Sequence, residues 1–225
     1  MNVILFGPPG AGKGTQADNI ARVFNLHKVS TGDLLRDEIK NKTDLGKKIK
    51  SIVDKGLFVS DSVINNLIIN PLSHKKFHNR LIFDGYPRNL NQAKNLDLLI
   101  KKHDQKISYV FSLNVDKELL IKRILGRQTC TNCGSIFNEY FRPSTNKNHT
   151  CGTKFLVKRS EDNEKTILYR FQAYLDKTLP ILDFYKKLNL LHQINGRSEI
   201  DQIFKEICAI MGFLETWLYK PYLYK

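Results

Sequence analysis

The chain has 225 residues, 41% of them hydrophobic, and its 36 Lys and Arg exceed its 22 Asp and Glu, for a formal charge of +14. This length can bury a sizeable core and fits one domain with insertions better than two independent domains. The sequence holds no apolar run of about 18 residues, so we expect no membrane span. No basic leader precedes the first apolar stretch, and we expect a cytoplasmic protein.

The positive charge indicates anionic partners, either nucleic acid or a polyphosphate. Many lysines, such as Lys47, Lys48 and Lys50, fall on predicted exposed helix faces. They are accompanied by no Arg-rich tract and no aromatic RNA-binding signature. We therefore expect small anionic ligands and no nucleic acid, with a basic nucleic-acid-binding module as an alternative.

The first predicted element is an apolar strand, Val3 to Phe6, which runs directly into the glycine-rich segment 7–15. A glycine-rich turn between a buried strand and a helix lets backbone N–H groups converge on a phosphate. Lys13 adds a positive charge for the outer phosphates. Gly14 stands where the general pattern has Ser or Thr, so Thr15 comes one place late. The segment predicts a phosphate-binding loop.

Helical periodicity follows the loop over residues 13–24, and then over three segments that form an insertion between the first strands, at 32–40, 45–55 and 61–70. Inside this insertion, 41–44 reads N-K-T-D, the pattern with which GTPases bind guanine. It lies close behind the phosphate loop and does not follow a late strand. We interpret it as a turn between two helices, and a GTPase stays a less favoured alternative.

Three further apolar runs have the length of strands, at 81–83, 109–113 and 190–194. Their alternation with helical segments predicts an α/β fold, in which a parallel sheet is covered by helices. Asp84 ends one of these strands, at the edge of a parallel sheet where ligands bind. An aspartate there can hold Mg²⁺ directly or through water, and we expect contact through water.

Arginines at the predicted edges of the core form a second group of candidate ligands, because guanidinium groups suit phosphate oxygens. Arg123 and Arg127 are four positions apart, which predicts one helix face. The whole group is Arg36, Arg88, Arg123, Arg127, Arg159 and Arg170.

Residues 128–158 are polar and hold three of the four cysteines. Cys130 and Cys133 begin a metal knuckle, but the second half is incomplete after Cys151. His149 is the best substitute for the fourth ligand, and Asn148 is a weaker one. We expect either a structural zinc site at Cys130, Cys133, Cys151 and His149 or a segment without metal. Cys208, in a predicted helix, is expected to be core.

The last predicted elements are a long helix over 161–188, interrupted at Pro180, and the strand 190–194. The tail, 213–225, is rich in aromatic residues, and we expect it to pack on the body of the protein or on a partner.

Together these segments resemble the adenylate kinases of the long-lid type, over about residues 1–211. The resemblance is carried by 7–15, 30–36, 84–88 with Gln92, 126–127 and 159–162. In that family the loop reads G-x-P-G-x-G-K-G-T, so the late Thr15 is the family form. Glu161 stands where the family usually has Asp. Long-lid relatives often carry zinc on four Cys or on three Cys and an Asp.

The resemblance implies a P-loop NTPase core in three pieces (1–29, 60–126 and 160–225), a helical NMP-binding insertion (30–59) and a lid (127–159). It implies that ATP binds Gly10, Ala11, Gly12, Lys13, Gly14, Thr15, Arg123, Arg127, Ile136, Phe137 and Ser198. It implies that AMP binds Thr31, Arg36, Leu57, Phe58, Val59, Gly85, Tyr86, Pro87, Arg88, Gln92, Arg159 and Arg170. The catalytic residues would be Lys13, Arg88, Arg127, Arg159 and Arg170.

The implied activity is reversible, in-line phosphoryl transfer, ATP + AMP = 2 ADP, by a monomer that uses Mg²⁺ and closes its lid over both substrates. Thr31 and Gln92 are the residues that the resemblance assigns to adenine. They favour AMP over the alternatives, which are kinases for UMP, CMP or GMP.

Overall fold

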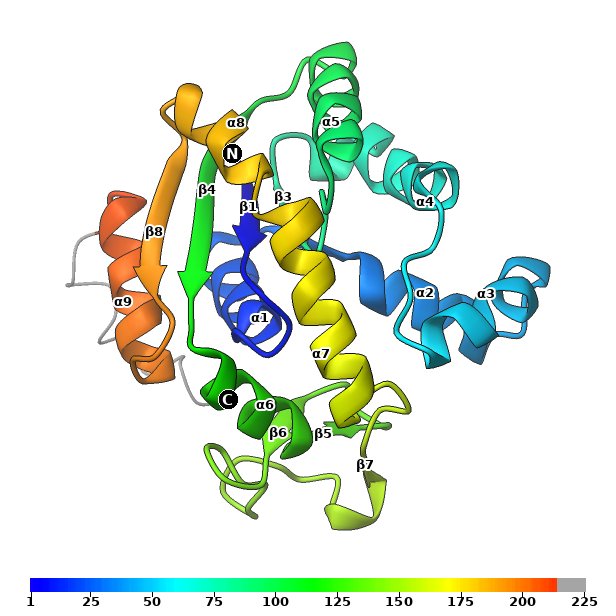
Figure 1. The fold of residues 1–225 in the computed structure, drawn as a ribbon. Helices are drawn as coiled ribbons and strands as arrows, with labels where there is room; N and C mark the ends of the chain where they lie inside the picture. The colour runs from blue at the N-terminus through cyan, green and yellow to red at the C-terminus, as the bar shows by residue number, and fades with distance from the viewer. Residues whose placement is uncertain (214–225) are drawn as a thin grey trace.

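The computed structural model describes residues 1–213 and has a parallel sheet of five strands at its centre (Figure 1), in the order β2-β3-β1-β4-β8. The strands are β1 (Asn2–Phe6), β2 (His27–Ser30), β3 (Leu81–Asp84), β4 (Ile107–Asn114) and β8 (Leu191–Asn195). The predicted parallel α/β sheet is thus confirmed. The sequence analysis missed β2, whose first two residues are polar and only partly covered.

Both faces of the sheet are buried, which explains the continuous apolar sequence of β1. Ile4 and Phe6 pack in one hydrophobic cluster with α4 (Asp61–Ser73), α5 (Leu90–Lys102) and α8 (Ile181–Lys187). Val3 and Leu5 pack in the other, with α1 (Lys13–Phe24), α6 (Lys117–Leu125) and α9 (Ile200–Ile210). Cys208 lies fully buried in this second cluster, as predicted.

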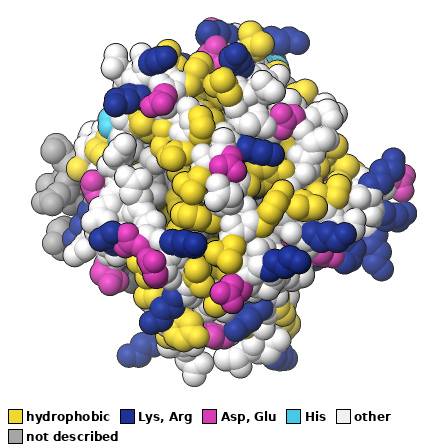
Figure 2. All heavy atoms as spheres, in the orientation of Figure 1, with side chains coloured by type: hydrophobic (Ala, Val, Ile, Leu, Met, Phe, Trp, Pro, Cys, Tyr) yellow, Lys and Arg dark blue, Asp and Glu magenta, His cyan; other side chains and the backbone are white. Residues whose placement is uncertain are grey.

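Two helices project from the sheet as a helical arm, α2 (Thr31–Lys40) and α3 (Asp44–Asp54), on the right of Figure 1. The Thr43 hydroxyl accepts a hydrogen bond from Gly46 N at 2.9 Å and caps α3. Lys42 has φ 52°, so 41–44 is the turn between two helices that the sequence predicts. Figure 2 shows Lys and Arg side chains gathered over α3, where Lys47, Lys48 and Lys50 are exposed.

A small antiparallel sheet lies beyond α6, at the bottom of Figure 1. Its strands are β5 (Arg127–Cys130), β6 (Ile136–Asn138) and β7 (Leu156–Val157), and β7 follows a short 3-10 helix, Thr153–Phe155. Arg123 and Arg127 do not share a helix face, because α6 ends at Leu125 and Arg127 begins β5. That prediction was wrong: Gly126 at the C-cap ends the helix between them.

The predicted long helix over 161–188 is divided into α7 (Glu164–Ala173), a π-helical turn (Tyr174–Thr178) and α8. Pro180 stands at the N-cap of α8, so the break falls where the sequence predicts it. A further 3-10 turn, Lys75–Phe77, follows α4.

Phe213 packs edge-on against Phe24, with ring centroids 4.7 Å apart. The rest of the predicted aromatic tail, 214–225, lies outside the described residues. None of the described helices has the length and apolar character needed to cross a membrane.

Candidate functional site

The phosphate-binding segment lies at the carboxyl end of β1, where it turns into α1. Gly10 (φ 82°) and Gly12 (φ 94°) adopt left-handed conformations that favour glycine. A Cβ atom on Gly10 would lie 2.7 Å from Ile124 Cγ1, so the loop also needs glycine for close packing. Gly12 is the N-cap of α1 and provides no side-chain cap. The first N–H groups of α1 are therefore available to an anion.

Lys13 turns back over this loop. Its Nζ donates hydrogen bonds to the carbonyl oxygens of Gly7 (2.7 Å) and Pro8 (3.0 Å). Burial lowers the pKa of Lys13 to about 8, and the positive charges of Arg88, Arg170 and Arg127 add to the effect, against the attraction of Asp84. A cation held among other cations indicates a site that is completed by an anion.

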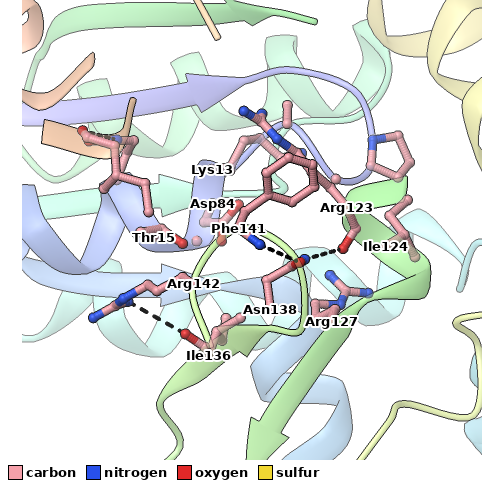
Figure 3. Close-up of a pocket in the computed structure, with 18 of the residues that line it drawn as sticks. Lys13, Thr15, Asp84, Arg123, Ile124, Arg127, Ile136, Asn138, Phe141 and Arg142 are labelled. Atoms are coloured by element: carbon pink, nitrogen blue, oxygen red, sulfur yellow. Dashed lines mark hydrogen bonds between the residues drawn. The ribbon is translucent and has the colours of Figure 1, made fainter. Parts of the chain in front are cut away.

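The loop opens into a cavity of about 440 Å³. Ten lysines and arginines and three acidic residues line it, so its charge suits a polyphosphate. Figure 3 shows Lys13, Thr15 and Asp84 on one side of the cavity, with Ile136, Asn138 and Phe141 of the small-sheet region facing them. The sequence-predicted residues that line it are Gly10, Ala11, Gly12, Lys13, Gly14, Thr15, Arg36, Asp84, Gly85, Arg88, Arg123, Arg127, Ile136, Phe137, Arg159, Arg170 and Ser198.

The eight arginines of the cavity each come from a different element or loop, and several of them repel one another. Burial lowers the pKa of Arg88 to about 10, with Arg170 adding to the effect. Burial also lowers the pKa of Arg159 to about 10, with Arg127 and Arg36 contributing. Arg88 is held by a bond from Nε to Gly85 O at 2.7 Å. Such cations are poised to bind phosphate groups.

The remaining residues predicted to bind nucleotide do not line this cavity. Phe58 and Pro87 line a second, smaller cavity of about 60 Å³ that also touches Arg88 and Arg170. The Phe58 ring lies under two cations, Arg88 Cζ at 5.3 Å and Lys177 Nζ at 5.5 Å from its centroid. The predicted residues that line neither cavity are Thr31, Leu57, Val59, Tyr86 and Gln92.

Several lining residues were not predicted from the sequence, and four of them lie near the predicted pair 136–137: Asn138, Tyr140, Phe141 and Arg142. Asn138 Nδ2 donates to Arg123 O at 2.7 Å, which ties the small sheet to α6. The Arg123 guanidinium lies 5.8 Å from the centroid of the Phe141 ring. Phe141 could have been predicted from the sequence, because a large aromatic residue in a polar stretch is a candidate for contact with a ligand.

The two acidic residues after Arg159 bind arginines of the cavity. Glu161 is buried and accepts a bond from Arg36 Nη1 at 3.3 Å. Asp162 forms a two-pronged ion pair with Arg127, with Nε to Oδ2 at 2.8 Å. Glu161, where the resemblance implies Asp, thus provides an acidic partner for the helical arm.

The cysteines of the small-sheet region come together as a candidate metal site. One ligand atom from each of Cys130, Cys133, His149 and Cys151 lies within 4.8 Å of the others. His149 is buried, and its Nε2 has no hydrogen-bond partner in the described structure. Its Nδ1 is paired with the Ser144 hydroxyl at 2.9 Å. This arrangement leaves Nε2 as a ligand and fits zinc with three sulfur atoms and one nitrogen.

Comparisons with known proteins bear on the family of the chain. Residues 5–190 match the family model described as adenylate kinase. The chain is 46% identical over 211 residues to an adenylate kinase of Pelagibacter ubique, which covers 94% of this chain and 99% of the relative. It is 39% identical over 218 residues to one of Archaeoglobus fulgidus (96% of this chain, all of the relative). These matches give no support to a GTPase or a nucleic-acid-binding module. The chain, with its P-loop core and phosphotransferase site, belongs to the adenylate kinase family.

Proposed function

We propose that the enzyme transfers the γ-phosphoryl group of MgATP directly to AMP and forms two molecules of ADP. The observation that carries this proposal is the cavity at the phosphate loop, in which the charges of ten lysines and arginines far exceed those of three acids. A transferring phosphoryl group needs positioned cations and no covalent nucleophile. We also propose that the protein acts as a cytoplasmic monomer.

On the donor side, the loop 10–15 binds the phosphates of ATP, and Arg123 and Arg127 contact ATP from the direction of the small sheet. Residues 127–159 act as a lid, with Ile136, Phe137 and Ser198 at the nucleoside. Support comes from the position of these residues in one cavity wall. Closure of the lid would exclude water and so prevent hydrolysis of ATP.

On the acceptor side, the arm 30–59 and the segment 85–92 bind AMP, between core and lid. Thr31 donates to Gly85 O at 2.9 Å, which joins the arm to this segment. Arg36, Arg88, Arg159 and Arg170 hold the phosphate of AMP. Four guanidinium groups from separate elements can fix its oxygen in line with the γ-phosphorus.

In the reaction, a bond forms between an oxygen of the AMP phosphate and the γ-phosphorus as the bond from that phosphorus to the β,γ-bridging oxygen breaks. The electron pair of the broken bond stays on the departing ADP. Lys13, Arg88, Arg127, Arg159 and Arg170 stabilise the charge on the oxygens of the phosphoryl group in flight.

Magnesium would be held near Asp84. The carboxylate lies at the end of β3, and a Cβ atom on Gly14 would be 3.5 Å from Asp84 Oδ2. Among the described residues, no side-chain hydrogen bond or ion pair occupies the Asp84 carboxylate, which lines the cavity and is available to a hydrated cation. When bound, Mg²⁺ neutralises charge on the β- and γ-phosphates.

Zinc would be held by Cys130, Cys133, Cys151 and His149 and would stiffen the lid without taking part in the chemistry. The unpartnered Nε2 of buried His149 supports this ligand set. Asn148 is the weaker choice, because its amide oxygen already accepts a hydrogen bond from Thr145 N at 2.8 Å.

The test is a coupled assay of ADP formation from MgATP with AMP, GMP, CMP and UMP as acceptors. We expect kcat/KM to be about a hundredfold higher for AMP than for the others, because a site that hydrogen-bonds adenine rejects bases whose groups do not pair with it. Preference for another acceptor would refute the proposal and favour a GMP or UMP/CMP kinase.

A further inference from the structure

The side chain of Gln92, which is buried and only 4% exposed, is held by two partners of opposite kind. Its Nε2 donates to Asp61 Oδ1 at 2.6 Å. Its Oε1 accepts from the backbone N–H of Arg88 at 2.7 Å. A carboxylate can only accept and a backbone N–H can only donate, so the two partners fix which end of the amide is oxygen.

Asp61 is itself held in place by a neighbour. Asn89 Nδ2 donates to both of its carboxylate oxygens, at 2.9 and 3.0 Å. Asn89 Oδ1 in turn accepts from Gln92 N at 2.8 Å and caps α5. The start of α4, which carries Asp61, is thereby joined to the start of α5, which carries Gln92. Rotation of the Gln92 amide would break two of these bonds, and rotation of the Asn89 amide would break three.

We infer that Asp61 is a specificity-determining positioning residue, which locks the Gln92 amide in the orientation that pairs with adenine and rejects a 6-oxo purine in the acceptor site. The inference rests on the proposed binding of AMP at Gln92. Asp61 itself does not touch the nucleotide.

The chemistry of the two kinds of purine explains the selectivity. After its bonds to Asp61 and Arg88, the Gln92 amide retains one hydrogen on Nε2 and one lone pair on Oε1. Adenine offers a donor at N6 and an acceptor at N1, and these complement the amide. Hypoxanthine and guanine have an acceptor at position 6 and a donor at N1, so in the same place each would face a group of its own kind. Rotation of the amide would relieve this mismatch, but Asp61 and Arg88 N–H oppose rotation.

The test compares AMP with IMP, which differs at positions 6 and 1 but has no 2-amino group. In Asp61→Asn the new amide can both donate and accept, so a rotated Gln92 would meet one mismatched partner in place of two. We expect the ratio of kcat/KM for AMP to that for IMP to fall about tenfold, through KM, while the KM for ATP stays within about twofold. Dissociation constants of AMP and IMP from calorimetry should change in the same way.

Asp97→Asn is the matched control, because Asp97 lies on α5, the helix of Gln92, in an exposed ion pair with Lys101 (2.7 Å), and the ratio of this variant should not change. If Asp61→Asn does not fold, Asp61→Ser replaces it: its shorter side chain removes the acceptor that holds Gln92 Nε2, so the ratio should fall in the same direction. An unchanged ratio in a folded variant, with activity lost equally for both nucleotides, would overturn the inference. A wild-type enzyme without preference for AMP would instead refute the proposed function.

Discussion

The central sheet and the small sheet are stabilised in different ways. The central sheet buries apolar side chains on both faces, and it tolerates several mutually repelling cations at its edge. Within residues 127–158, by contrast, only Cys130, Phe137 and His149 are buried. A segment with so little core needs a cross-link to hold one conformation. Two of its three buried side chains, Cys130 and His149, are candidate zinc ligands. We therefore expect a bound metal to stabilise this segment in place of a hydrophobic core.

The largest effect should follow from the loss of the cation in the phosphate loop. Lys13→Met should lower kcat by about 10²- to 10³-fold, because a group that acts on transferring charge is lost. The fold should persist, since the central sheet carries the core. Steady-state kinetics measure kcat, and circular dichroism measures whether the fold persists. Lys101→Met, at an exposed ion pair of α5, should keep full activity. A similar loss in both variants would contradict the special role of Lys13.

Loss of the metal should affect the small sheet and spare the central one. We expect one zinc ion per chain in protein purified without added metal, and little in Cys133→Ser or His149→Ala. Chelation should speed proteolysis within 127–158 without unfolding the core, as local opening costs less than global unfolding. Cys208→Ala, in the core at α9, should retain zinc. Zinc-free wild-type protein with an equally resistant small sheet would show that the cross-link is unnecessary.

A smaller effect should appear where the arm meets α7. Gly56 has φ 68°, and a Cβ atom there would lie 2.1 Å from Thr166 Cγ2, so Gly56→Ala must push the arm away from α7. We expect the KM for AMP to rise about tenfold and the KM for ATP to change less. Gly212→Ala is the control, since Gly212 has φ 77° but nothing within 4 Å of the added Cβ atom. Equal KM values for AMP in the two variants would indicate backbone strain alone.

The smallest effect is on the pH dependence of stability. The pKa of Lys13 is about 8 in the folded protein and near 10.5 when unfolded, so the unfolded chain binds more protons between these values. The wild type should therefore gain stability relative to Lys13→Met as pH rises from 8 to 10.5. The total gain over this range should be about 1–2 kcal/mol, which is less than the full pKa shift implies, because partly exposed Lys13 is screened by water. Urea unfolding at several pH values would measure this difference, and a constant difference would contradict the account.

The sequence predicted the lining of the cavity at the phosphate loop better than it predicted the strands of the small sheet. The glycine-rich loop, Asp84 and the arginines could be found because backbone and charge requirements leave local patterns. The strands of the small sheet could not, because they are short and partly exposed, with no clear alternation. Nor could the contact of Asp61 with Gln92, which joins residues 31 positions apart through the packing of two helices.

The most direct test of the account follows the γ-phosphoryl group itself. The protein is incubated with MgATP labelled at the γ-phosphate, with and without AMP, and the labelled products are separated. With AMP, the label should appear in ADP at the β-position, and without AMP little label should be released. Release of labelled inorganic phosphate at the same rate in both samples would contradict direct transfer between nucleotides and identify the cavity as a hydrolase site.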